Sequence, residues 1–229
     1  MEAKLLLFAA FVCSMLLMSY NYGKKKKKII FFGDSITEQG VKADGYITKL
    51  MNLLKRDEED GNYNLIGAGV GGNKVYDLHL RVDEDVLAKG PDVVVIFIGV
   101  NDVWQKQTFG AATDANEFEA RYEAIIKNLQ ASSCKIIICT PAAIGEKTNG
   151  SNDLDDDLNK YCNIIVGLAQ KNDLPLVDLR QAFLTYNLTN NPEDKHAGIL
   201  TTDGVHLNEA GNQLVAEEMY KVLKQLSSA

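Results

Sequence analysis

The stretch DVVVIFIG, residues 92–99, decides the fold class, because six consecutive hydrophobic residues, most of them β-branched, stand at its centre. A strand with one face in water alternates hydrophobic and polar residues, whereas a continuous hydrophobic run predicts a strand covered on both faces. The run ends at a glycine, which favours a tight turn. Residues 92–99 therefore predict a central strand of a sheet that has helices on both sides.

Short hydrophobic runs of this kind alternate along the chain with stretches of helical period. The expected strands are residues 29–33, 63–67, 92–99, 135–140 and 176–179, and the expected helices are 46–55, 75–88, 118–131, 154–170 and 208–226. Such alternation specifies a parallel sheet with right-handed crossovers. The sequence predicts a three-layer α/β/α sandwich with a mostly parallel, flavodoxin-like five-stranded sheet. The longest irregular stretches are expected at 142–157 and 185–202.

The first residues differ in composition from the rest. Residues 5–18 are hydrophobic apart from Ser14, a length typical of a signal peptide and short of the ~20 residues that span a bilayer. We expect residues 1–23 to be a signal peptide or N-terminal hydrophobic anchor, residues 24–28 a lysine-rich flank, and residues 29–229 a single domain. Export to the periplasm or the outside follows, although five lysines behind the hydrophobic segment oppose translocation and keep anchoring through residues 5–18 open.

Charge and cysteine content exclude several classes of partner. The formal net charge is -7, and the five lysines of residues 24–28 leave the folded part still more acidic, which excludes a nucleic-acid partner. Cys134, Cys139 and Cys162 are an odd number and are expected to be buried thiols. The chain has no H-E-x-x-H motif and no cysteine/histidine cluster. Neither a metal nor a cofactor is therefore expected.

A serine stands directly after the first expected strand, in Gly33-Asp34-Ser35. Its hydroxyl becomes a good nucleophile when a base removes its proton, and a strand-to-helix turn would present it beside helix N–H groups. The same residues are more commonly a helix cap than a nucleophile turn. The motif alone leaves both interpretations open.

The sequence Asp203-Gly-Val-His206 stands just before the last expected helix. A carboxylate and an imidazole three positions apart on a loop can form a hydrogen bond, so that Asp203 orients His206 while the other ring nitrogen faces a serine. The other two histidines, His79 and His196, have no comparable neighbour. An isolated D-x-x-H is common, so this pair also gains meaning only beside other elements.

Two further strand ends carry hydrogen-bond donors that suit a developing oxyanion. Asn101 follows the central strand in GVND, residues 99–102, and its side-chain amide can donate a hydrogen bond. A cap of a local turn is the alternative role of Asn101. The stretch GAGVGGN, residues 67–73, offers backbone N–H groups at the end of the second strand.

These four elements together resemble the SGNH (GDSL-type) hydrolase family. The resemblance rests on FFGDSIT, GAGVGGN, IFIGVND and TTDGVHLNEAGN in this order, and it extends from about residue 29 to about residue 226. It implies that Ser35 is the nucleophile, His206 the general base and Asp203 its partner. It also implies an oxyanion hole made by the N–H groups of Ser35 and Gly69 and the side chain of Asn101.

The resemblance has one local departure and leaves the substrate contacts open. Family members often carry asparagine where this chain has Gly67, which puts the choice of Gly69 over Gly71 or Gly72 in doubt. Asp34, Asp102 and Trp104 are candidates for substrate contact. Phe109 is a further aromatic side chain that could line the site.

Two rival motifs are incomplete. Gly67-x-Gly-x-x-Gly72 fits a dinucleotide-binding fingerprint, but the acidic residue expected about 20 positions further on should end a strand, whereas Asp92 begins one. The alternating acidic residues of 153–157 resemble the start of a calcium loop, which requires glycine and glutamate where this chain has Leu158 and Ile164. A nucleotide-binding oxidoreductase and a calcium site are therefore disfavoured.

The sequence predicts a serine ester hydrolase that acts through an acyl-enzyme on Ser35 without a cofactor. The family contains acetylesterases, lysophospholipases and thioesterases, and the few aromatics near the site favour small acyl groups, such as acetyl on a carbohydrate. A lysophospholipase or thioesterase on the same triad and a non-catalytic carbohydrate-binding relative stay open. Asn149 and Asn187 begin glycosylation sequons. The natural ester and the oligomeric state are not predicted.

Overall fold

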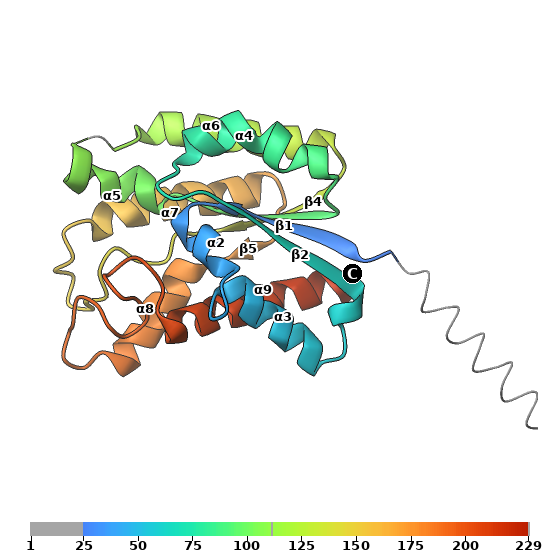
Figure 1. The fold of residues 1–229 in the computed structure, drawn as a ribbon. Helices are drawn as coiled ribbons and strands as arrows, with labels where there is room; N and C mark the ends of the chain where they lie inside the picture. Colours follow the sequence, from blue (N-terminus) through green and yellow to red (C-terminus); the bar gives the residue numbers. More distant parts are fainter. Residues whose placement is uncertain (1–24, 111, 229) are drawn as a thin grey trace, which may run out of the picture.

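The computed structural model describes residues 25–110 and 112–228 and contains a five-stranded parallel sheet between two layers of helices (Figure 1). Its strands, in chain order, are β1 (Lys27–Gly33), β2 (Tyr63–Gly69), β3 (Val93–Phe97), β4 (Lys135–Cys139) and β5 (Leu176–Val177). They lie in the order β2-β1-β3-β4-β5, and every neighbouring pair is parallel. This order confirms the predicted flavodoxin-like sheet with 92–99 at its centre.

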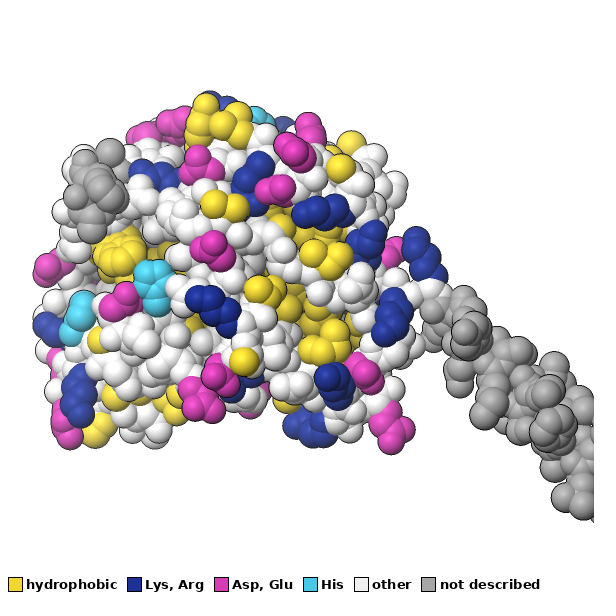
Figure 2. Space-filling model, in the orientation of Figure 1, with side chains coloured by type: hydrophobic (Ala, Val, Ile, Leu, Met, Phe, Trp, Pro, Cys, Tyr) yellow, Lys and Arg dark blue, Asp and Glu magenta, His cyan; other side chains and the backbone are white. Residues whose placement is uncertain are grey.

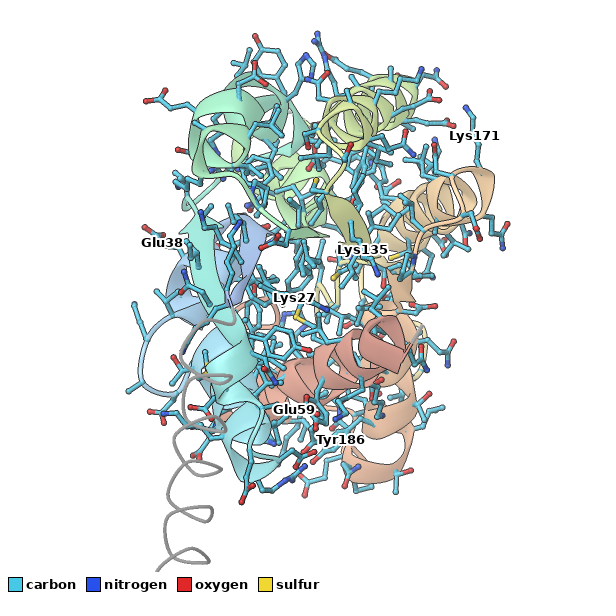
Figure 3. The ribbon with its side chains drawn as sticks, turned by 90° about the vertical axis from the view of Figure 1, so that its right-hand side faces the viewer. Lys27, Glu38, Glu59, Lys135, Lys171 and Tyr186 are labelled. Atoms are coloured by element: carbon cyan, nitrogen blue, oxygen red, sulfur yellow. The ribbon has the colours of Figure 1, made fainter. Side chains whose placement is uncertain are left out.

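The helices cover both faces of the sheet. They are α2 (Ser35–Gly40), α3 (Tyr46–Arg56), α4 (Val75–Asp85), α5 (Val100–Phe109), α6 (Ala115–Ala131), α7 (Asp155–Lys171), α8 (Leu179–Asn190) and α9 (Glu209–Ser228), with short 3-10 helices at Asp60–Asn62 and Leu87–Lys89. α3 and α8 pack against α9, whereas α6 packs against α4 and α7. Figure 3 shows the layers end-on, with Lys27 and Lys135 at the amino ends of their strands.

The continuous burial of β1 explains why its sequence does not alternate. Ile29, Ile30, Phe31 and Phe32 are consecutive residues, and each is 0% exposed, so both faces of the strand lie in hydrophobic core. All five residues of β3 are buried in the same way. β2 at the sheet edge is more exposed, with Leu65 and Ile66 half-buried.

The structure corrects several boundaries and adds three helices that the sequence pattern did not predict. α2 is too short for a recognisable period, α5 begins inside a strand-end motif, and α8 occupies residues 185–190, which were expected to be irregular. α8 begins with a capping contact, in which the Asp178 carboxylate accepts the N–H of Gln181. The helix has no clear hydrophobic stripe by which the sequence could have predicted it. The expected helix 75–88 ends at Asp85, because Val86 leaves the helical region of backbone space.

Cys139 and Cys162 are buried free thiols as predicted, whereas Cys134 is half-buried. Asn187 is 3% exposed inside α8, so its sequon is inaccessible in the folded chain, while Asn149 is exposed.

Across residues 25–110 and 112–228, no helix has both the length and the hydrophobicity needed to cross a bilayer. The expected signal peptide or anchor, residues 1–23, lies outside the described residues.

Candidate active site

Ser35 is the first residue of α2 and stands at the carboxyl end of β1. Asp34 caps this helix, because its Oδ1 accepts the N–H of Ile36 at 2.9 Å. Gly33 is required by close packing, since a Cβ there would clash with the carbonyl oxygen of Phe97 and with the Thr37 side chain. The strand-to-helix turn therefore places a half-buried serine beside the unpaired N–H groups of a helix start.

The structure brings Ser35, His206 and Asp203 together. Ser35 Oγ lies 3.1 Å from His206 Nε2, although the two residues are 171 positions apart. His206 Nδ1 lies 2.7 Å from Asp203 Oδ2, and Asp203 Oδ1 accepts the N–H groups of Val205 and His206 at 2.9 and 2.7 Å. A proton can pass from the serine to the histidine in this arrangement, while the carboxylate holds the ring in one orientation.

The local charges suit this proton transfer. Partial burial acts to raise the pKa of Asp203, but hydrogen bonds from the His206 ring and from the backbone N–H groups of His206 and Val205 outweigh it and hold that pKa below its usual value. Asp203 therefore stays an acceptor for the His206 Nδ1–H. The Trp104 ring lies edge-on to the His206 ring, with centroids 5.8 Å apart, so it forms one wall beside the histidine.

Hydrophobic, histidine and acidic side chains gather over the carboxyl ends of the strands, at the left of the face in Figure 2. Trp104 is the predicted aromatic residue that the structure places next to the triad. The side chain of Phe109 lies outside the described part of the structure.

Asn101 and the glycine-rich turn lie at the same end of the sheet. Asn101 is 3% exposed near the start of α5, and its Nδ2 donates to the carbonyl of Asn73 at 3.0 Å. An amide has two N–H donors, so this bond leaves a second one for a ligand. Gly69 packs against the backbone of α2, where a Cβ would clash with Glu38 N, whereas a Cβ on Gly71 would lie 4.0 Å from Ser35 Cβ.

Two of the candidates for substrate contact, Asp34 and Asp102, are buried beneath the site, at 2% and 0% exposed. Asp34 caps α2, and Asp102 accepts the N–H of Val75 and the hydroxyl of Thr113, the latter at 2.7 Å. Desolvation raises the pKa of Asp34 to about 7 and that of Asp102 to about 6. Both carboxylates thus hold backbone segments in place under the site.

Sequence reasoning missed Arg81, which lies on α4 and joins three segments of the site. Its guanidinium donates to the carbonyls of Gly33 at 2.7 Å and Ala68 at 3.1 Å, and its Nε donates to Asn73 Oδ1 at 2.8 Å. The guanidinium also lies 4.5 Å above the Phe32 ring. A single arginine on an amphipathic helix has no local signature, so no pattern in the sequence indicates this role.

The fold and the site define a serine hydrolase: an α/β/α sandwich with a serine, a histidine and a carboxylate in hydrogen-bonded sequence at the carboxyl ends of its strands. Comparison with known proteins specifies the family. The model of the GDSL-like Lipase/Acylhydrolase family matches residues 31–214. The chain belongs to this family, as the sequence motifs indicated, and is a serine hydrolase of carboxylic esters.

Related proteins support this placement over nearly the whole chain. The crystal structure of an acetyl xylan esterase, AlAXEase, has a TM-score of 0.84 and 56% sequence identity, covering 86% of this chain and 99% of its own. The acetylxylan esterase of Geobacillus stearothermophilus is 28% identical over 205 residues, 83% of this chain and 90% of that protein. The uncharacterised lipoprotein YqeF of Bacillus subtilis is 24% identical over 223 residues, 85% and 88% respectively.

The raised pKa of Asp34 predicts a pH dependence of stability. Between the ordinary value of 3.8 and the folded value of about 7, the unfolded chain releases a proton that the folded chain keeps. The contribution of Asp34 is therefore present at low pH and lost as the pH rises through about 7. Relative to Asp34→Asn, the wild-type free energy of unfolding in urea should fall from about pH 4 to about pH 7. A difference that does not change with pH would contradict this assignment.

The contacts of Arg81 predict a catalytic defect when its planar guanidinium group is replaced. Arg81→Lys keeps the charge but cannot reach two carbonyls and Asn73 together, so kcat on a chromogenic ester should fall by roughly 10- to 100-fold with a smaller change in KM. Asp85→Asn is the matched control, because it removes the ion pair of Arg81 and leaves the contacts with the strand ends. Equal losses in both variants would show that general stability, not the position of the strand ends, is responsible.

Proposed function

We propose that this protein removes acetyl and other short acyl groups from carbohydrates, through an acyl-enzyme on Ser35. The observation that carries the proposal is the hydrogen-bonded chain Ser35 Oγ, His206 Nε2, His206 Nδ1 and Asp203 Oδ2, with distances of 3.1 and 2.7 Å between the residues. The expected partner is a small-molecule or carbohydrate ester, and the reaction requires no cofactor.

The proposed reaction has two acyl-transfer steps. Ser35 Oγ attacks the ester carbonyl while His206 takes its proton, and His206 then gives that proton to the departing alcohol. Water then attacks the acyl-enzyme while His206 takes its proton, and His206 returns that proton to Ser35 Oγ as the acid leaves. The negative charge on the carbonyl oxygen is stabilised in both steps by the N–H groups of Ser35 and Gly69 and by the side chain of Asn101.

The choice of substrate is supported by the relatives and by the wall of the site. Two proteins similar to this chain, one of them at 56% identity, are described as acetyl xylan esterases. The Trp104 ring beside His206 limits the space next to the histidine, which favours a small acyl group. A lysophospholipase or thioesterase on the same triad would need room for a long acyl chain.

Two variants separate the proposed roles of nucleophile and oxyanion donor. Ser35→Ala should abolish both turnover and labelling by a fluorophosphonate probe, while Asn101→Ala should lower kcat by about 100-fold or more and leave the serine in place.

The wild type should hydrolyse acetate esters and acetylated xylo-oligosaccharides faster than long-chain esters. A preference for long acyl chains or lysolipids would favour the lysophospholipase alternative. Absence of labelling in the wild type would favour a non-catalytic carbohydrate-binding relative.

We also propose that the protein is exported, with residues 1–23 as signal peptide or anchor, 24–28 as a lysine-rich flank and 29–229 as the hydrolase domain. The hydrophobic residues 5–18 support this division, and one relative is described as a lipoprotein. The intact mass of the protein recovered from medium and from membranes should show loss of the N-terminal segment in the exported form. Full-length protein in the cytoplasm alone would contradict export.

A further inference from the structure

Glu146 is a buried carboxylate outside the triad, in the loop between β4 and α7, and is 1% exposed. Its Oε1 accepts the N–H groups of Leu200 and Thr201, each at 2.6 Å, and its Oε2 accepts the N–H of Ile199 at 2.8 Å. Three consecutive backbone N–H groups thus converge on one side chain. These amides belong to the segment that leads directly into Asp203 and His206.

We infer that Glu146 is a positioning residue of the esterase site, whose carboxylate sets the place of the Asp203–His206 turn relative to Ser35. This inference rests on the proposed function. The inference goes beyond the proposed function, because it assigns a role in the reaction to a side chain that touches neither the substrate nor the triad.

The contacts of Thr201 carry the constraint from Glu146 to the histidine. Thr201 forms an antiparallel bridge with Leu207, and its hydroxyl accepts the N–H of Gly204 at 3.0 Å. The N–H of Thr202 donates to the carbonyl of His206 at 2.8 Å. Thr201 therefore both closes the turn and donates one of the three N–H groups that Glu146 accepts.

A second contact with the same loop fixes the far side of the turn. The N–H of Gly145, the neighbour of Glu146, donates to the carbonyl of Gly204 at 2.8 Å. Both glycines have positive φ angles, +90° and +94°, and a Cβ on Gly204 would lie 3.2 Å from Gly145 N. The two backbones approach closely, so movement of residue 146 displaces the turn that lies between Asp203 and His206.

The backbone of Glu146 is also fixed by hydrogen bonds. The side chain of Asn191 donates to the carbonyl of Glu146 at 2.9 Å, and the N–H of Glu146 donates to the carbonyl of His196 at 2.9 Å. Its side chain and main chain are therefore fully engaged in the protein interior. Glu146 thus links the β4–α7 loop to the loop between α8 and α9.

These contacts of Glu146 matter for catalysis because Ser35 and His206 lie on separate elements. Ser35 is fixed by β1 and α2, whereas His206 lies on a loop outside the sheet, and their 3.1 Å contact depends on where that loop sits. A displacement of about 1 Å in a reacting group can cost on the order of 100-fold in rate. The position of the base is thus as important as its presence.

Glu146→Gln tests the inference. The amide oxygen can still accept two N–H groups, but the NH2 group would face a third N–H donor, so the turn should shift while the fold persists. We expect kcat for acetate esters and the rate of fluorophosphonate labelling to fall by roughly 10- to 100-fold, with KM changed by less than about threefold. The downfield proton resonance of the His206 Nδ1–H, hydrogen-bonded to Asp203, should move or broaden.

Asp194→Asn is the matched control. Asp194 joins the same two loops by accepting the N–H groups of Thr148 and Asn149 at 2.6 and 3.3 Å, away from the Asp203–His206 turn. This variant should keep the wild-type kcat, labelling rate and proton resonance. If Glu146→Gln does not fold, Glu146→Asp, which keeps the charge on a shorter side chain, takes its place in the same measurements.

The outcomes separate this inference from the proposed function. Wild-type kcat and an unchanged resonance in the folded Glu146 variant would overturn the inference, as would an equal loss in Asp194→Asn. Failure of the proposed function would appear in the wild type itself, as no ester turnover and no labelling of Ser35. In that case the His206 resonance still reports whether Glu146 positions the turn.

Discussion

The register of β1 between β2 and β3 is the constraint on which the site depends. Gly33 pairs with Gly69 on one side and with Phe97 on the other, so three strands end at one level. The chain continues from these ends into the serine turn, the glycine-rich turn and Asn101. Close packing at Gly33 holds this register, because a slip that put a side chain at this position would make its Cβ clash with the carbonyl oxygen of Phe97.

The other half of the site is held by hydrogen bonds to loops. Asp203 and His206 lie outside the strands of the sheet, and their turn is closed by Thr201 and attached to the β4–α7 loop through Gly145 and Glu146. Ser35 is thus positioned by the packing of β1 together with the hydrogen bonds of Asp34 and Arg81, whereas His206 is positioned by buried polar contacts between loops. Both sets of contacts must act for the two side chains to meet at 3.1 Å.

The strands and the main site residues could be predicted because their signals are local. Continuous hydrophobic runs indicated the five strands, and FFGDSIT and TTDGVHL contained the serine and the histidine pair that the structure brings into contact. Helix α8 was missed, because it starts from a cap and lacks a clear hydrophobic stripe. Asp34 and Asp102 were expected near the substrate, but each is committed to internal hydrogen bonds that no sequence pattern displays.

The sequence by itself determined the layered parallel sheet, the family and the candidate site residues Ser35, Asp203 and His206, since each depends on residue type and spacing within a short segment. Tertiary structure alone decided how these segments are held relative to one another. Arg81 joins the ends of β1 and β2 to Asn73, and Glu146 binds amides more than 50 residues away. The physical reason is that a buried charged side chain finds its partners by proximity in space, which the order of residues along the chain does not record.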